Sequence, residues 1–353
     1  YLFFGLRRGG KKYYALNVTN PSSPSLEWVN SYGLGDSWSQ PVLKMLKLSN
    51  TATENSPVLV IGGGHNDANT TEGNAVHVIS ALDASGYSAG DEIWSTKTAE
   101  STGLAQDTID NGVPARVRVL DYDRNGSIDR LYFGDTGGNI WRVDLDAGDY
   151  SGNASDKGDI DKAKLYKIAE LGGTGADNRK FFEEPDVAIF RQKGSIVTTI
   201  AIGSGDRTNP LESVVENHFY VLYDRNYPNA SDLITMSTAG LKPAASVVAL
   251  DIGTLEFRGW YRSLGSTTGE KVLAPAVTYQ NMVFFTTFGT IAVTPDACSP
   301  SNSSSARFYI VSLISGEVYT NVEAAKGEIL GTPQIYFKSL TNNAGNGPCV
   351  HGD

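Results

Sequence analysis

The sequence predicts an all-β protein, folded as a modified β-propeller of about seven blades with a calcium loop between two strands. Short apolar runs that end in glycine recur along the chain, and an aromatic-rich run often follows each of them. The chain also holds 38 Gly, 17 Tyr and 13 Phe residues. This composition favours many short strands joined by tight turns.

Length and charge restrict the class of protein further. The 353 residues are 40% hydrophobic and 19% charged, which is typical of a globular chain, and we expect one propeller domain over residues 1–353. The net charge of −10 argues against binding to nucleic acid or to an anionic membrane. No stretch approaches the roughly 18 apolar residues of a membrane span. The chain begins inside a strand-like run without an initiator Met, so we expect a fragment of a longer protein.

The repeated unit is a strand, a Gly- or Asp-containing turn and a second strand. The aromatic-rich strands of these units are predicted at residues 13–18, 76–83, 139–145, 218–224, 246–251 and 307–313. Apolar runs precede most of them, at residues 58–64, 131–135, 199–205 and 283–287. Near-continuous apolar strands of this length are typical of sheets buried on both faces, as propeller blades are.

We count six or seven blade equivalents. The first run, residues 1–5, and the last, residues 335–337, are expected to share one blade and to close the ring, because closure removes exposed sheet edges. A pair of β-sandwiches is the non-closing alternative. Residues 159–169 are the one stretch predicted as a short helix.

The loop at residues 121–129 has the spacing of a calcium site. Side-chain oxygens stand at positions 1, 3, 5 and 9, and Gly126 occupies position 6, where the chain must turn sharply. An EF-hand would carry Glu at position 12, where this chain has Tyr132, and the flanking runs are strand-like. The predicted ligands are the side chains of Asp121, Asp123, Asn125 and Asp129 and the backbone carbonyl of Ser127.

A polar hairpin turn without a metal is the alternative, because Asn-Gly is a strong turn signal. Arg124 and Arg130 would then neutralise part of the carboxylate charge. We favour a metal because clustered carboxylates repel one another without a cation. We favour Ca²⁺ because every predicted ligand atom is oxygen and no Cys or His lies near.

Other reactive residues give little support for catalysis. The four histidines do not have zinc-site spacing, and Ser204 follows a strand with no nucleophile-elbow motif. Cys298 and Cys349 lie in polar surroundings that favour a surface disulfide, with two free thiols as the alternative. We therefore predict that the protein is not an enzyme.

The loop and its surroundings resemble the C-terminal domain of the PilC/PilY family of type IV pilus biogenesis factors and adhesins. The residues that carry this resemblance are DYDRNGSIDR at 121–130 and LYFGDTGGNIWRVDL at 131–145. Supporting segments follow the family's order at residues 10–19, 33–42, 58–65, 179–188, 200–207, 259–264, 269–273 and 283–288.

The resemblance implies a calcium-binding propeller whose occupancy regulates pilus extension and retraction and supports twitching motility and host-cell adhesion. It implies pilins, minor pilins and host-cell surface ligands as partners. It also implies a place on the bacterial surface, at the pilus tip or outer membrane, after export through the periplasm. We expect the family's N-terminal domain to be absent from this fragment. The Arg-Gly-Asp tripeptide of some members is missing too, so integrin binding is not implied.

Two alternative functions remain open at this point. The repeat of aromatic-Leu-Asp, Gly and Trp also resembles propellers of quinone-dependent dehydrogenases, which hold calcium beside a cofactor in a central funnel. Here the predicted ligands come from one contiguous loop, which favours a structural ion. A glycan-binding propeller with sugar-stacking aromatic side chains is the second alternative.

Overall fold

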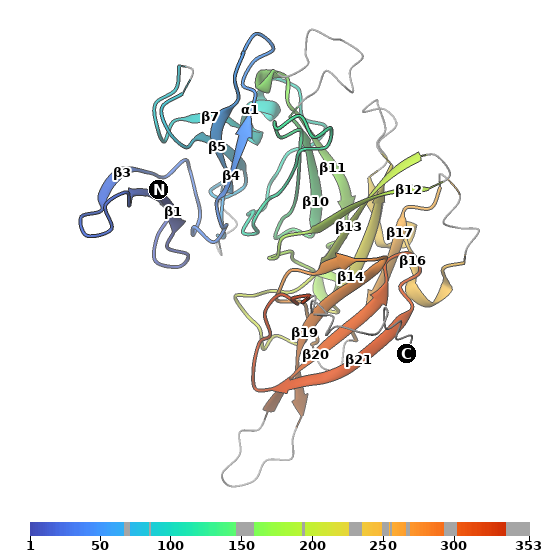
Figure 1. Ribbon diagram of the computed structural model, residues 1–353. Helices are drawn as coiled ribbons and strands as arrows, with labels where there is room; N and C mark the ends of the chain where they lie inside the picture. The colour runs from blue at the N-terminus through green and yellow to red at the C-terminus, as the bar shows by residue number, and fades with distance from the viewer. Residues whose placement is uncertain are drawn as a thin grey trace, which may run out of the picture.

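The computed structural model is nearly all-β and describes residues 1–66, 71–84, 86–145, 159–192, 195–225, 235–248, 254, 256–265, 269–292 and 302–336. These residues form five sheets, which follow one another from the N-terminal sheet to the C-terminal one (Figure 1). We number them sheets 1 to 5 along the chain. No helix in the described ranges is long and apolar enough to cross a membrane.

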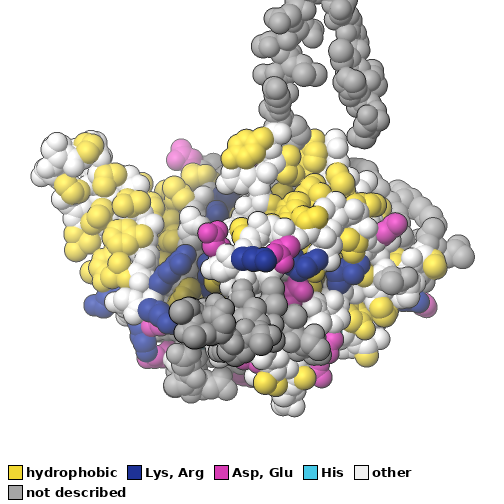
Figure 2. Space-filling model, turned by 90° about the horizontal axis from the view of Figure 1, so that it is seen from below, with side chains coloured by type: hydrophobic (Ala, Val, Ile, Leu, Met, Phe, Trp, Pro, Cys, Tyr) yellow, Lys and Arg dark blue, Asp and Glu magenta, His cyan; other side chains and the backbone are white. Residues whose placement is uncertain are grey.

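Sheets 1 and 2 are antiparallel. Sheet 1 contains β1 (Leu2–Gly5), β2 (Tyr13–Asn17) and β3 (Ser25–Asn30). Sheet 2 contains β4 (Val42–Leu46), β5 (Ser56–Gly62), β6 (Val76–Ser80) and β7 (Glu92–Ser95), and the helix α1 (Thr96–Ser101) follows β7 directly. Sheet 1 forms the left-hand lobe in Figure 2, where hydrophobic side chains gather, and its Leu2 and Leu26 are 50% and 58% exposed.

Sheets 3 and 4 each gain a short parallel strand from one segment of the chain. Sheet 3 contains β8 (Arg118–Leu120), β9 (Arg130–Gly134), β10 (Asn139–Asp144), β11 (Lys164–Glu170) and the short β15 (Met236–Ser237). Sheet 4 contains β12 (Asp186–Gln192), β13 (Ser195–Gly203), β14 (His218–Asp224), β17 (Gly259–Ser263) and the short β16 (Lys242–Pro243). Because β15 and β16 lie close in sequence, this segment ties the two sheets together.

Sheet 5 and the short helices complete the described structure. Sheet 5 contains β18 (Val277–Tyr279), β19 (Met282–Ala292), β20 (Asn302–Ser312) and β21 (Val318–Lys326). The 3₁₀ turns are η2 (Ile160–Lys162), η3 (Gly175–Asp177), η5 (Thr238–Gly240) and η6 (Ala244–Ser246).

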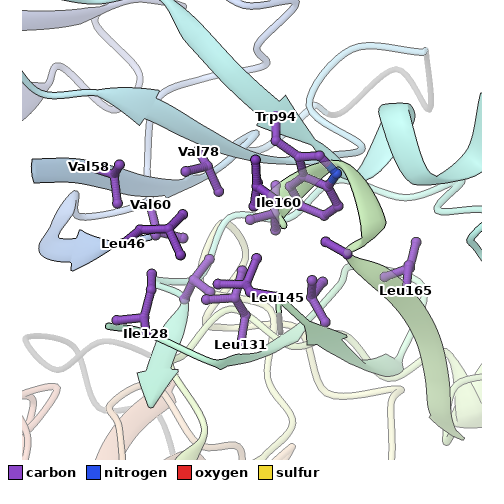
Figure 3. Close-up of a cluster of buried hydrophobic side chains, with 14 of the residues drawn as sticks. Leu46, Val58, Val60, Val78, Trp94, Ile128, Leu131, Leu145, Ile160 and Leu165 are labelled. Carbon is purple, nitrogen blue, oxygen red and sulfur yellow. The ribbon is translucent and has the colours of Figure 1, made fainter. Parts of the chain in front are cut away.

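Hydrophobic clusters join each sheet to the next one. Figure 3 shows the cluster between sheets 2 and 3, to which Val58 and Trp94 contribute from one sheet and Leu131 and Leu165 from the other. Equivalent clusters join sheets 1 and 2, sheets 3 and 4, and sheets 4 and 5. A sheet with a neighbour on either side buries both of its faces, and β9 is accordingly buried at every residue. The propeller-like architecture predicted from the sequence is confirmed.

The predicted blade count and ring closure differ from the structure. Five of the six predicted repeat strands lie in five different sheets, whereas residues 246–248 of the sixth form no strand and residues 249–251 lie outside the described ranges. The pairing of residues 1–5 with 335–337 is wrong for the described part. The strand β1 pairs there with β2 alone, and the exposed Tyr336 belongs to no strand.

The predicted helix at residues 159–169 is also wrong. Only the 3₁₀ turn η2 is helical there, and most of the remaining residues form β11, which pairs with β10. Leu165 and Ile168 are buried in two different clusters, so tertiary packing on both faces of sheet 3 outweighs local helix propensity. The sequence pattern does not predict the helix α1.

Candidate metal centre

The predicted calcium loop connects β8 to β9 on sheet 3. The two strands are antiparallel, and Leu120 pairs with Arg130, so the loop between them closes on itself. It brings together Asp121, Asp123 and Asp129, from each of which a carboxylate oxygen lies within 4.8 Å of the others. Three of the five predicted ligand residues thus form one cluster.

Backbone amides hold two of these carboxylates in place. Asp129 Oδ2 accepts hydrogen bonds from the backbone N–H of Tyr122 at 2.5 Å and of Asp123 at 3.2 Å. Asp121 accepts from the N–H of Asn125 at 3.1 Å and of Gly126 at 3.0 Å. The loop backbone therefore curls around the carboxylates and orients them.

Asn125 and Ser127 belong to the same loop. The side-chain Nδ2 of Asn125 donates a hydrogen bond to Asp123 Oδ2 at 2.9 Å. The side-chain Oδ1 of Asn125 accepts one from the backbone N–H of Ser127 at 2.7 Å. Ser127 Oγ accepts from the backbone N–H of Lys47 at 2.9 Å. Asn125 thus contacts the carboxylate cluster directly, whereas the Ser127 hydroxyl bonds to the chain just beyond β4. The role of the Ser127 carbonyl as a ligand stays a prediction.

Two left-handed residues make the sharp turn. Gly126 has a φ of 86° and Arg124 a φ of 62°. Glycine adopts this conformation without a steric penalty, which explains why position 6 of the loop carries it. Asn55 donates from Nδ2 to the Gly126 carbonyl at 3.2 Å and so supports the turn from the segment before β5.

The loop is docked on the hydrophobic core. Ile128 is 3% exposed and belongs to the cluster between sheets 2 and 3 (Figure 3). Its backbone N–H donates to the carbonyl of Met45, on β4, at 3.0 Å. The residue next to it is Asp129, so the carboxylate cluster is joined directly to the packing between two sheets.

Asp129 is the buried member of the cluster. Burial raises the pKa of its carboxyl to about 6, and the charges of Asp123 and Asp121 act in the same direction, while the two backbone hydrogen bonds oppose them. A bound cation would stabilise a carboxylate in this position. Three carboxylates and an amide oxygen are hard donors of the kind that Ca²⁺ prefers, so the residues present fit the predicted ion.

A metal-free turn would use Arg124 and Arg130 to balance its carboxylates, and one of these two arginines already pairs with another carboxylate. Arg130 is fully buried and donates from Nε to Asp144 at 2.7 Å, while its guanidinium carbon lies 5.2 Å from the centre of the Tyr122 ring. Arg124 is exposed to solvent at the tip of the loop. Arg130 is therefore already paired, and its charge is not free for the loop.

Sequence reasoning missed a buried network of charges beside this loop. Arg142 donates to Asp144 at 2.9 Å and to both carboxylate oxygens of Asp224 at 2.9 Å. Tyr132, which occupies the twelfth loop position, donates its hydroxyl to Asp224 at 2.6 Å. The two guanidinium groups, of Arg130 and Arg142, thus balance the charges of the two carboxylates, of Asp144 and Asp224. The available signal was the presence of charged residues inside otherwise apolar strands.

Other predicted positions contribute no site. Ser204 Oγ donates to Asn217 and accepts from the backbone N–H of His218, so its hydroxyl is used in a turn. Cys298 and Cys349 lie outside the described residues.

The chain is similar in sequence to known pilus proteins, although no protein-family model matches it. The type IV pilus biogenesis factor PilY1 of Pseudomonas aeruginosa, in strains PAO1 and PAK, is 31% identical over 151 residues, which is 42% of this chain and 11% of that protein. A PilY1 homologue of Xylella fastidiosa is 25% identical over 323 residues, 80% of this chain and 20% of that protein. The chain thus spans about a tenth to a fifth of the length of these relatives.

A solved structure shows the same fold. The crystal structure of the Pseudomonas aeruginosa PilY1 C-terminal domain matches with a TM-score of 0.60 at 18% identity, covering 90% of this chain and 68% of that chain. At that level of identity the match concerns the fold alone. This chain is therefore similar in sequence to PilY1 proteins and in fold to the PilY1 C-terminal domain, which confirms its resemblance to the C-terminal domain of the PilC/PilY family.

Proposed function

We propose that this chain is a calcium-binding propeller domain of a type IV pilus-associated protein on the bacterial surface. In this proposal, occupancy of the loop at residues 121–129 regulates pilus extension and retraction and supports twitching motility and host-cell adhesion. The partners are pilins, minor pilins and host-cell surface ligands. The proposal assigns the domain no catalytic role. Its main support is the cluster of three loop carboxylates, together with the names of the relatives.

The loop residues would hold the ion in distinct ways. Asp121, Asp123 and Asp129 supply carboxylate oxygens, Asn125 its side-chain oxygen and Ser127 its backbone carbonyl. The ion supplies the positive charge that the cluster lacks. Because hydrogen bonds within the loop already orient Asp121 and Asp129, binding requires little rearrangement of these two residues.

Calcium binding would stabilise more than the loop. An ion that binds only the folded state stabilises it by RT ln(1 + [Ca²⁺]/Kd), about 2.7 kcal/mol at one hundred times Kd. Since Ile128 packs between sheets 2 and 3, that energy also opposes separation of the two sheets. A surface protein would meet calcium levels that a cytosolic protein does not.

Calorimetric titration with Ca²⁺ tests the ion. We expect wild-type protein to bind one ion, and the Asp123→Asn/Asp129→Asn variant to lose binding, because it keeps the side-chain shapes and removes two charges. Asp161→Asn, at an exposed carboxylate outside the cluster, is the matched control and should bind like wild type. Unchanged binding in the double variant would show that the site is wrongly assigned.

The pilus role needs a separate test in the complete protein of its own organism. The same two variants are introduced into the full-length gene, and surface pili and twitching zones are measured. We expect the double variant to change both, and Asp161→Asn to change neither. If calcium binding is lost but pili and twitching are unaffected, the ion assignment stands and the regulatory role does not.

A further inference from the structure

A cavity of about 580 Å³ lies where the five sheets converge. Arg7 follows β1, Gln40 precedes β4, and Arg118, Asp186 and Val277 are the first residues of β8, β12 and β18. The strands β4, β8, β12 and β18 are the first strands, in chain order, of sheets 2, 3, 4 and 5, so each of these sheets begins at the cavity. The cavity is therefore at the common end of these strands, and its volume is that of a small-molecule site.

Basic side chains slightly outnumber acidic ones in the charged lining of this cavity. Four arginines and three acidic residues line it, namely Arg7, Arg116, Arg118, Arg207, Glu183, Glu184 and Asp186. The chain as a whole has a net charge of −10, so this local excess of positive charge is a distinct feature. It favours an anionic ligand.

The acidic residues do not saturate the arginines. Arg118 reaches Glu184 and Asp186 at 3.5 Å each, and Arg116 reaches Glu184 at 3.6 Å. Charge-assisted hydrogen bonds are usually about 2.7–2.9 Å long, so these are loose pairs. Arg118 Nε also has no hydrogen-bond partner in the part of the chain that the structure describes. Both guanidinium groups keep donor capacity for a ligand.

Glu183 contributes less negative charge than a fully ionised carboxylate. It accepts a hydrogen bond from Arg207 at 2.8 Å, yet burial raises the pKa of its carboxyl to about 7. Near neutral pH, part of the population therefore carries a proton there. Burial of Glu183 therefore acts in the same direction as the excess of arginines.

Two aromatic side chains are among the residues that line the cavity. Trp38 and Phe182 line it, and the guanidinium carbon of Arg7 lies 5.4 Å from the centre of the Trp38 ring. Arg7 has a φ of 51°, an uncommon conformation for a residue other than glycine, and its N–H donates to the Ser37 carbonyl at 3.2 Å. Strained residues of this kind cluster at binding sites.

We propose that this cavity binds an organic monocarboxylate with a flat apolar body. Arg116 and Arg118 bind the carboxylate, and Trp38 packs against the body. A carboxylate fits better than a phosphate, because Glu184 and Asp186 would repel a second negative charge. This chemistry has two sources, a free aromatic acid or the carboxyl terminus of a peptide, and the experiment separates them.

The probes are 2-naphthoate, N-acetylphenylalanine and the uncharged amide of each, titrated by calorimetry into the whole chain. We expect at least one acid to bind, and its amide to bind at least tenfold more weakly. Binding of 2-naphthoate alone identifies a free acid as the source, binding of N-acetylphenylalanine alone identifies a peptide terminus, and binding of both supports a site open to either. If neither acid binds, or an amide binds as tightly as its acid, the proposal is overturned.

Variants locate the binding. Arg116→Gln changes a side chain that is 41% exposed, so the fold should tolerate it, and Arg118→Gln is the second variant. Each should weaken binding about tenfold or more, the effect of one lost charge-assisted hydrogen bond. Arg307→Gln, on β20 outside the cavity, is the matched control, and circular dichroism checks folding. Wild-type affinity in both cavity variants would refute the site.

Discussion

The guanidinium group of Arg142 lies 2.9 Å from both carboxylate oxygens of Asp224, although 82 residues separate the two in the chain. Arg142 is on β10 and Asp224 on β14, so the pair joins sheet 3 to sheet 4. Both side chains are almost completely buried. The attraction to Arg142 and Arg130 lowers the pKa of Asp224 to about 2, against the effect of burial.

Asp224→Asn should therefore lower the free energy of unfolding by about 3–5 kcal/mol, because Asp144 would then be the one carboxylate left for both buried guanidinium groups of Arg130 and Arg142 in this network. Urea denaturation measures the change. Glu72→Gln breaks an exposed pair with Lys11 and should leave the stability nearly unchanged, because solvent screens that pair. Similar losses in the two variants would contradict this account of the network.

Gly126→Ala should cost about 1–2 kcal/mol and weaken calcium binding, since alanine is strained at a φ of 86°. A Cβ atom there meets nothing closer than 3.9 Å, so the cost comes from the backbone alone. Gly10→Ala is the control, because an added Cβ there has nothing within 4 Å and the φ is not left-handed. Thermal unfolding of both variants, with and without Ca²⁺, gives the comparison. Equal melting temperatures for the two would rule out strain at the loop.

His218 should make stability fall in acid. Burial, followed by the charge of Arg179, lowers the pKa of its imidazole to about 4, below the ordinary value of 6.5. The unfolded chain thus takes up the proton first, so the contribution is complete above about pH 6.5 and is lost as the pH falls toward 4. Its size is at most about 2 kcal/mol once solvent screening is allowed for. Urea denaturation of His218→Gln should show a correspondingly flatter pH profile between pH 6.5 and 4.

Removal of calcium should expose the loop to proteolysis. Arg124 is exposed at the tip of the loop, and mutual repulsion of three carboxylates loosens the metal-free loop. Trypsin should cleave after Arg124 several times faster in EGTA than in Ca²⁺, as mass spectrometry of the products will show. Loss of the cut in Arg124→Gln identifies the position. Cleavage at an equal rate in both conditions would argue against an ion at this loop.

The architecture was largely predictable because burial on both faces leaves a sequence pattern. Residues 58–64 and 131–135 are apolar at nearly every position, and both contribute to interior strands of their sheets, β5 and β9. The carboxylate cluster was predictable for another reason, since Asp121, Asp123 and Asp129 come from one short loop whose geometry depends on local spacing. Features confined to a few consecutive residues can be recognised in the sequence.

Features that depend on long-range packing were not predicted. Arg142 and Asp224 come from different sheets, and no local pattern pairs them. Residues 159–169 look helical by composition, but the neighbouring strand β10 decides their conformation. The arginine-lined cavity draws on all five sheets, so its composition depends on the order in which the sheets are arranged.

The adjacency of Ile128 and Asp129 has a mechanical consequence. Ile128 packs in the hydrophobic cluster between sheets 2 and 3, and Asp129 belongs to the carboxylate cluster. A force that pulls these two sheets apart therefore acts on Ile128, which bonds to Met45 of sheet 2, while backbone hydrogen bonds to Leu120 and Leu145 hold Asp129 on sheet 3. If a cation bound in the loop opposes that separation, thermodynamic reciprocity requires that tension between the two sheets lower the affinity for the cation. The concentration of the ion would then determine how strongly the loop holds sheets 2 and 3 together.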